Sequence, residues 1–397
     1  MSVLRKLHAA GHGPTPRTGF EARASLRRLL AFAFAAMSIA WPAHGEDAGL
    51  QLLSVAHEPN LLDPDADESA AVSFETTEEA EVSLEIYDDL DRLVARIGDA
   101  SVRKAGRHTL AWDGLDLKGR RVPPEAYRYV LLAKSARTGE TSIYPAAPPG
   151  DRTRTVWLQA TWSPDTGTID YQLDRPSRVR VRVGLENDGP LLKTVVNWAV
   201  RDGGPQSDPW DGMDQSGEID LSDHAALAVS VRAFPLPSNT ILVGPPAAAP
   251  QYLDDVAPAD STEDPSKSGT HRMFDYANQH PKRRRDFPIE LVVSGSKRDS
   301  DSKGWHPRSS ADQQVTISIA DEDLAQLIDE GFEAVYFVDG RRSFEAEVAF
   351  FPIVWDLSTE NLTDGEHLLS VNLRGFDGHF GIASRVIRIE SSPSDSE

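Results

Sequence analysis

The most constraining feature of this sequence is a turn motif that occurs twice, each time at nearly the same distance after an alternating segment. Residues 82–87 and 179–183 alternate apolar and polar side chains, which is typical of half-buried strands. A Trp-Asp-Gly-x-Asp-x-x-Gly motif begins 30 residues after Val82 and 31 residues after Val179. Its fixed residues are Trp112, Asp113, Gly114, Asp116, Gly119, Trp210, Asp211, Gly212, Asp214 and Gly217. Because the motif and its spacing both recur, the two segments are expected to share one fold.

The motif can be explained without a ligand. The tryptophan ring is large and apolar enough to fill the space between two sheets. Asp-Gly is typical of a tight turn, because glycine adopts positive φ and aspartate accepts hydrogen bonds from nearby backbone amides. We therefore predict that the aspartates of both copies form turns and do not bind a metal.

The first copy resembles the immunoglobulin-like domain named after the flagellar hook-capping protein FlgD. The resemblance lies in the strand at residues 82–87, in Gly106-Arg107-His108-Thr109, in the tryptophan turn and in Val122-Pro123 before Tyr127. The second copy keeps the turn but lacks the Gly-x-His segment before it, so it is a divergent relative. The resemblance implies a β-sandwich. It implies no biochemical activity, because one fold serves many functions.

A third strand-rich region follows a change in composition. Prolines mixed with Asp, Ser and Thr predict a linker from residue 246, and strand-like runs return at 315–319, 334–338 and 368–374. Residues 321–330 could form a short helix, and Trp355-Asp356 suits a turn before a closing strand. The expected fold class is all-β, with tandem immunoglobulin-like β-sandwiches. The expected domains are a signal peptide (1–45), an FlgD-like sandwich (46–150), a divergent FlgD-like sandwich (151–245), a linker (246–284), a C-terminal immunoglobulin-like sandwich (285–390) and a disordered tail (391–397).

The N-terminus has the pattern of an export signal. A basic region precedes an apolar stretch from Leu29 to Trp41, and small residues follow before Glu46. The apolar stretch is shorter than the roughly 20 residues that span a bilayer, so a membrane anchor is the weaker reading. We expect the mature protein in the periplasm or outside the cell, without an integral membrane segment.

Charge and cysteine content exclude several classes of protein. The chain holds 41 Lys and Arg against 62 Asp and Glu; residues 1–45 hold six of the former and one of the latter, which leaves 35 against 61 and a net charge of −26. Such a surface repels nucleic acid. With no cysteine, the chain has no disulfide, thiol nucleophile or cysteine-bound metal.

No catalytic motif was found, so we predict that the chain is not an enzyme and has no cofactor. A P-loop, Gly-x-Ser-x-Gly and His-Glu-x-x-His are all missing from the sequence. The run Asp63-Pro64-Asp65-Ala66-Asp67 begins like a calcium loop, but Glu68 and Phe74 stand where glycine and a bidentate carboxylate belong. We therefore read this run as an acidic turn. His271, His280 and His306 match no metal-binding spacing.

Two other groups of residues suggest binding. The basic run Lys282, Arg283, Arg284 and Arg285 interrupts an acidic chain and is either a solvated charge run or a partner contact. Trp157, Trp162 and Trp198 flank the second repeat. They are expected to pack in the core, although an exposed row of them would favour stacking on sugars.

The favoured function is that of a non-catalytic, exported structural or assembly protein that contacts a protein partner in the periplasm or at the cell surface. The alternative is a carbohydrate-binding or adhesive surface protein. A hydrolase with its site in residues 246–310 is the least favoured reading, because that region has the composition of a linker.

Overall fold

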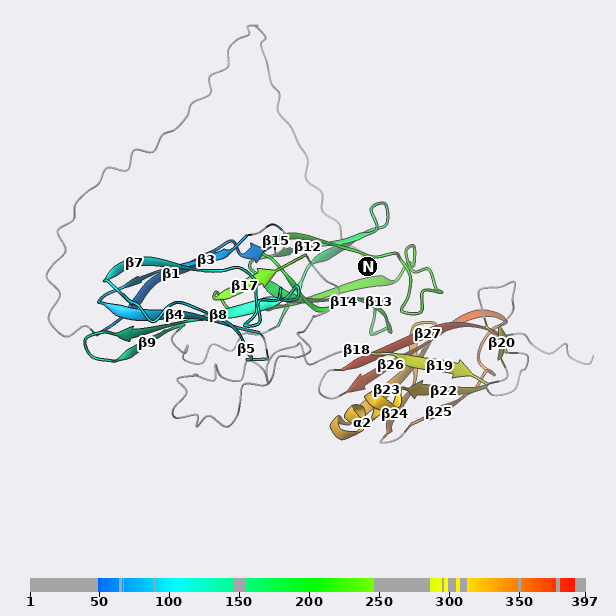
Figure 1. The fold of residues 1–397 in the computed structure, drawn as a ribbon. Coiled ribbons are helices and arrows are strands. Elements are labelled where there is room, and N and C mark those ends of the chain that lie inside the picture. The colour runs from blue at the N-terminus through cyan, green and yellow to red at the C-terminus, as the bar shows by residue number, and fades with distance from the viewer. Residues whose placement is uncertain are drawn as a thin grey trace, which may run out of the picture. The chain divides into compact units, whose positions relative to one another are not determined.

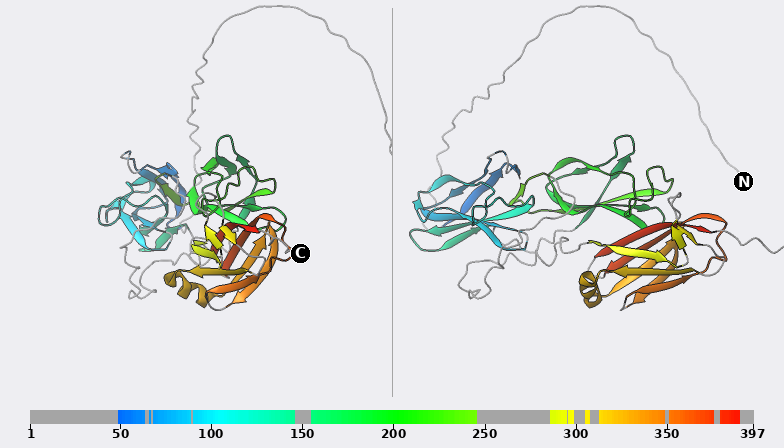
Figure 2. Two further views of the ribbon diagram at one scale, coloured as in Figure 1. Left: turned by 90° about the vertical axis from the view of Figure 1, so that its right-hand side faces the viewer. Right: turned by 45° about the vertical axis from the view of Figure 1, so that its right-hand side comes forward.

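The computed structural model describes residues 49–63, 66, 68–88, 90–145, 155–245, 286–294, 296–298, 305–307, 313–348, 351–375 and 379–389. The predicted signal peptide, linker and C-terminal tail lie outside these residues. Strands dominate the described part of the chain, and they form two layers in each of its strand-rich regions (Figures 1 and 2). The all-β expectation is confirmed.

The first region packs a three-stranded sheet, β1-β3-β7, against a seven-stranded sheet with the order β2-β17-β8-β4-β5, in which β6 pairs with β4 and β9 with β8. The inward-facing residues of these strands are apolar, and they pack together with Trp112, which is 1% exposed. The strands are β1 (Leu52–Glu58), β2 (Leu61–Leu62), β3 (Ala70–Thr76), β4 (Ala80–Tyr87), β5 (Leu93–Ile97), β6 (Val102–Arg103), β7 (Gly106–Trp112), β8 (Ala126–Ser135), β9 (Thr141–Tyr144) and β17 (Thr240–Val243).

The second region packs a four-stranded sheet, β10-β16-β13-β14, against a three-stranded sheet, β11-β12-β15. Trp210 lies in the core between them, in the position that Trp112 holds in the first region. The strands are β10 (Val156–Leu158), β11 (Ala160–Ser163), β12 (Thr168–Leu173), β13 (Ser177–Leu185), β14 (Leu191–Arg201), β15 (Gly204–Pro209) and β16 (Leu227–Pro235).

The third region packs a seven-stranded sheet, β20-β21-β27-β26-β23-β24 with β18 paired to β27, against a three-stranded sheet, β19-β22-β25. The helix α2 (Asp321–Glu330) contributes Leu327 to the core of this region. The strands are β18 (Asp286–Phe287), β19 (Ile289–Val293), β20 (Ser296–Arg298), β21 (Trp305–Pro307), β22 (Gln313–Ile319), β23 (Phe332–Val338), β24 (Arg341–Val348), β25 (Ile353–Leu357), β26 (Gly365–Gly375) and β27 (Phe380–Ile389).

Most of the local expectations are confirmed, and one is wrong. The predicted strands at 82–87, 179–183 and 315–319 lie within β4, β13 and β22, and the predicted helix is α2. Trp355, expected in a turn, lies instead in β25, where its ring stacks on Phe344. The aromatic contact places it on a sheet, and the turn before the closing strand comes later in the chain. No helix among the described residues is long and apolar enough to cross a membrane.

One strand crosses between repeats in a way that the sequence does not suggest. β17 lies inside the range predicted for the second sandwich, yet it pairs antiparallel with β8 and parallel with β2 of the first region (Figure 1). Ile241 and Val243 of β17 are buried in the core of the first region. The chain therefore returns to the first sheet after completing the second one, which ties the two regions together through backbone pairing. The domain boundaries themselves stay predictions.

We predict that Ile241→Ala destabilises the first region rather than the second. The Ile241 side chain is fully buried, so its truncation is expected to cost about 2–5 kcal/mol. Hydrogen exchange should become faster in β4 and β8 and stay unchanged in β12 and β15. Val156→Ala, at a 43% exposed position of an edge strand, is the control. Faster exchange confined to the second region would contradict the assignment of β17.

Candidate functional site

The two tryptophan turns have the same internal hydrogen bonds. The Trp112 indole donates to the carbonyl of Leu115 at 2.9 Å, and the Leu115 amide donates to the Asp113 carboxylate. In the second copy, Trp210 donates to Met213 at the same distance, and the Met213 amide donates to Asp211. All four motif glycines have φ between 74° and 77°, the left-handed region that glycine tolerates best. The motif aspartates thus act as turn formers.

The second aspartate of the motif has different partners in the two copies. Asp116 accepts hydrogen bonds from the backbone amides of Lys118 and Arg120. It also forms an ion pair with the Arg120 guanidinium at 2.8 Å. Asp214 has glutamate, not arginine, four residues later, and its buried carboxylate accepts from the hydroxyl of Ser384 in the third region at 2.5 Å. The second turn is therefore also a contact point for the third region.

The outer face of β13 carries a stripe of arginines. Val179, Val181 and Val183 point into the core of the second region, so the alternation of a strand directs Arg178, Arg180 and Arg182 to the opposite face. The sequence shows this alternation plainly. It assigns no role to the arginines, because their contacts come from distant parts of the chain.

The first arginine of the stripe, Arg178, forms a buried ion pair with a residue of the first region. The Arg178 guanidinium donates to the Glu125 carboxylate at 2.6 Å, and the two side chains are 0% and 3% exposed. Arg178 also donates to the carbonyl of Trp198 at 3.1 Å. Asn239, which precedes β17, donates from its side chain to the carbonyl of Tyr129 at 2.7 Å. The joint between the first two regions is thus polar, buried and hydrogen-bonded.

The last arginine of the stripe, Arg182, forms an ion pair with a residue of the third region. Arg182 donates to Asp286 at 2.6 Å, and its guanidinium lies 4.2 Å from the centre of the Phe380 ring. Burial lowers the pKa of Arg182 while Asp286 opposes this, and the guanidinium remains charged because its ordinary pKa is far above neutral. The Leu191 amide and carbonyl add two reciprocal hydrogen bonds of 2.8 Å with the Asn372 side chain. Both neighbours of the second region are therefore held by arginines of a single strand.

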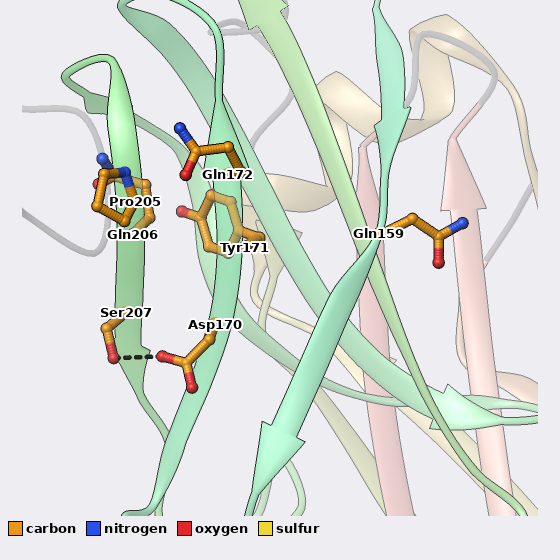
Figure 3. A pocket seen from close by; sticks show the side chains of 7 residues that line it. All are labelled: Gln159, Asp170, Tyr171, Gln172, Pro205, Gln206 and Ser207. Carbon is orange, nitrogen blue, oxygen red and sulfur yellow. Dashed lines mark hydrogen bonds between the residues drawn. The ribbon is translucent and has the colours of Figure 1, made fainter. Parts of the chain in front are cut away.

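A shallow groove lies on the other sheet of the second region, lined by Gln159, Asp170, Tyr171, Gln172, Pro205, Gln206 and Ser207, with a volume of about 690 Å³. Gln159 lies between β10 and β11, and Figure 3 shows it apart from the other lining residues and pointing away from them. Asp170 accepts from Ser207 at 2.6 Å, and the Tyr171 hydroxyl donates to Asp208 at 2.6 Å. Asp170 and Tyr171 thus have hydrogen-bond partners within the protein. The Tyr171 side chain is only 6% exposed, so it offers little ring surface to a ligand.

The three candidate tryptophans do not form an exposed row. Trp198 is 1% exposed, and Trp162 packs against Trp210 with the ring centroids 4.5 Å apart and the ring planes tilted by 57°. Trp157 is 65% exposed, but the Arg232 guanidinium lies 3.8 Å from the centre of its ring. Trp198 is thus buried as expected, but beside Arg180 on the arginine face and not in the core between the sheets, and Trp162 packs partly buried against that core. The expectation is wrong for Trp157, because its place on the outer face of an edge strand leaves it in solvent.

Several predicted residues cannot be placed. Lys282, Arg283, Arg284, Arg285, His271 and His280 lie outside the described residues, as do Asp65 and Asp67 of the acidic turn. Within the described ranges, no group of three or more His, Asp or Glu side chains is arranged to hold a metal ion.

Comparison with known proteins agrees with the resemblance. Residues 60–137 match the family described as FlgD Ig-like domain. No curated protein matches the sequence.

Several solved structures are similar at low identity. A tetra-tandem repeat from the extending region of a large adhesion protein is 13% identical, with 85% of this chain and 74% of that chain covered and a TM-score of 0.18. A Ca²⁺-stabilised adhesin that helps an Antarctic bacterium bind ice is 12% identical, with 87% and 74% covered and a TM-score of 0.18. The central fibronectin-III array of RIM-binding protein is 12% identical, with 85% and 96% covered and a TM-score of 0.17. At these TM-scores, the similarities carry no argument about function.

We predict that Arg178→Met destabilises the chain by about 3–5 kcal/mol, because the buried Glu125 carboxylate loses its counter-charge. The double variant R178M/E125Q should recover much of this loss, since neither charge is then left unpaired. Urea unfolding measures the free energy of unfolding of the single and the double variant. Arg137→Met is the control, because Arg137 is 66% exposed in its ion pair with Glu78, and a pair with one exposed partner should contribute less than about 1 kcal/mol. A double variant no more stable than R178M would contradict the coupling.

We predict that Asp116→Asn weakens the acid dependence of stability. Burial raises the pKa of Asp116, but hydrogen bonds from the backbone amides of Arg120 and Lys118 and from the Arg120 side chain outweigh it, so the pKa lies below its usual value. A lowered folded-state pKa contributes stability above the unfolded pKa of about 4, and this contribution is lost as pH falls through the folded value.

The urea midpoint of D116N should accordingly fall less steeply than that of the wild type below about pH 5. At neutral pH, the variant should be less stable by about 1–2 kcal/mol, since charge-assisted bonds become neutral ones. Asp113→Asn, which alters an exposed aspartate of the same turn, is the matched control. Parallel pH profiles for D116N and the wild type would refute the role of Asp116.

Proposed function

We propose that this chain is a non-catalytic, exported structural or assembly protein that mediates protein–protein contacts in the periplasm or at the cell surface. The proposal rests on the FlgD Ig-like match at residues 60–137, on the tandem sandwich architecture and on the export-type pattern of residues 1–45. Sandwiches of this kind present rigid faces and edge strands, which suit contacts with other chains.

The observation that carries the proposal is the pair of arginine joints on β13. Arg178 and Arg182 hold segments of the first and third regions through buried or half-buried carboxylates. Joints of this kind fix the orientation of neighbouring modules, so a partner meets a preformed surface and little ordering entropy is lost on binding. That property suits a scaffold, whereas neither the groove nor the paired side chains around it offers a reactive group.

The alternative, a carbohydrate-binding or adhesive role, has less support. Sugar-binding faces use exposed aromatic rings as stacking platforms. Of the three candidate tryptophans, Trp157 alone is exposed, and an arginine already covers part of its ring. The Figure 3 groove has amide and carboxylate groups that could bind hydroxyls, but no open ring face among the residues that line it.

The test is mild crosslinking of the mature chain (residues 46–397) in its native host, followed by identification of what is recovered. We expect one specific protein partner. Its loss from K282Q/R283Q/R284Q/R285Q, but not from the charge-matched control K104Q/R107Q/K134Q/R137Q, would place the contact at the basic run. Recovery of polysaccharide would favour the alternative, and recovery of no specific partner would contradict the proposal.

A further inference from the structure

A buried histidine of the third region has a hydrogen-bond acceptor at each of its ring nitrogens. His367 lies near the start of β26, and its side chain is 7% exposed. Its Nδ1 lies 2.6 Å from the Asp339 carboxylate, and its Nε2 lies 2.7 Å from the backbone carbonyl of Thr363. A neutral imidazole carries a proton on one nitrogen only, whereas the imidazolium donates from both. The protonated ring is therefore the form that fits both acceptors.

The aspartate that faces His367 also ties two strands together. Asp339 follows β23 in the turn to β24 and has φ of 50°, a left-handed conformation. Its Oδ2 faces the His367 ring, while its Oδ1 accepts from the Leu368 amide at 2.9 Å. The Asp339 amide in turn donates to the Leu368 carbonyl at 2.9 Å. The proton on His367 thus holds the carboxylate that joins the β23–β24 turn to β26.

Both sides of this tie contact the second region. Leu368 packs against the hydrophobic core of the second region. Gly340, the residue after Asp339, lies close to Leu185 at the end of β13, because a Cβ added to Gly340 would stand 3.0 Å from the Leu185 Cδ1. The pair of His367 and Asp339 therefore supports two of the contacts that join the second and third regions.

On the elements packed around the ring, Asp339 is the charged group that faces His367 directly. On β27, Ile387 stands opposite His367, and Arg385 lies on the same face of that strand, opposite Leu369. The other charged residues of the neighbouring segments are exposed to solvent: Arg341, Glu360, Asp364, Glu366 and Arg388. Burial lowers the pKa of His367, but the hydrogen bond to the Thr363 carbonyl and the hydrogen bond and charge of Asp339 outweigh it, so the pKa lies above its usual value.

We propose that His367 is a pH-dependent latch for the joint between the second and third regions. With its proton in place, His367 holds Asp339, and Asp339 holds Leu368 and the Gly340 turn against the second region. When the proton is lost to solvent, one ring nitrogen presents a lone pair to an acceptor at hydrogen-bonding distance, so that contact opens and the joint loosens. The inference goes beyond the proposed function, because it holds whichever partner the chain binds.

The direction of the pH effect follows from the raised pKa of His367. A folded-state pKa above the unfolded value of about 6.5 gives a stabilising contribution that is complete below the unfolded value. This contribution is lost as pH rises through the folded-state pKa. Acid conditions therefore favour a fixed arrangement of the two regions, and alkaline conditions favour a looser one.

Two measurements on the mature chain test the latch. The first is an NMR titration of the histidine ring nitrogens, in which the His367 signals are identified by their loss from H367Q. We expect His367 to titrate above about pH 6.5 and above the exposed His224. The second measures the distance between spin labels on Gln172→Cys and Glu290→Cys, two exposed positions of the second and third regions in a chain without cysteine. The distance distribution should be narrow below the His367 midpoint and broad above it.

Three variants separate the latch from a general effect of pH. H367Q stays neutral at every pH, so its distance distribution should be broad throughout. D339N keeps an acceptor for the ring but removes the negative charge, so the midpoints of His367 and of the joint should both fall by about one pH unit. H224Q changes an exposed histidine of the second region and should behave like the wild type.

A joint midpoint that coincides with the His367 titration, and moves with it in D339N, would establish the latch. A His367 midpoint no higher than that of His224 would overturn it. The same holds for a distance distribution that does not change with pH, or for a pH dependence that persists in H367Q. If circular dichroism shows that H367Q does not fold, D339N decides the question alone, because unchanged midpoints in that variant also refute the latch.

Discussion

The ion pair between Arg178 and Glu125 is the interaction on which the arrangement of the first two regions depends. Both side chains are almost fully buried, so each charge would be costly without the other. The pair lies beside the chain segment that leads into β17, which completes the first sheet with residues that follow the second one. Backbone pairing places β17 in the first sheet, and the ion pair links β13 of the second region to Glu125 beside that sheet.

The alternation of β13 makes this possible. One side of the strand supplies valines to the core of the second region, and the other supplies arginines whose partners lie in the first and third regions. A strand buried on both faces is usually apolar on both. Here the charged side chains are buried by neighbouring regions, so β13 serves as core and as interface at once. A β-bulge where β14 pairs with β13, between Val179 and Val181, adds Trp198 to the arginine face, and the Arg180 guanidinium lies 4.7 Å from the centre of its ring.

Local signals in the sequence predicted much of the fold. The tryptophan turns, the alternating strands and α2 follow from residues close together in the chain, and the turns fold through hydrogen bonds that span only a few residues. The arginine joints could not be predicted in this way, because Glu125 lies 53 residues before Arg178 and Asp286 lies 104 residues after Arg182. The place of β17 could not be predicted for the same reason: residues 240–243 fall within the range expected for the second sandwich, and only their pairing with β2 and β8 assigns them to the first sheet. Trp157 was misplaced because periodicity does not distinguish an outward position on an edge strand from one in the core.

Buried ion pairs often contribute less to stability than apolar residues of the same volume would, so stability alone does not explain why this chain uses them. They do restrict the ways in which two surfaces fit, because a misplaced neighbour leaves a buried charge without a partner. In a chain of repeated sandwiches, apolar joints could slide or rotate, whereas Arg178 and Arg182 each donate to a carboxylate at one fixed position.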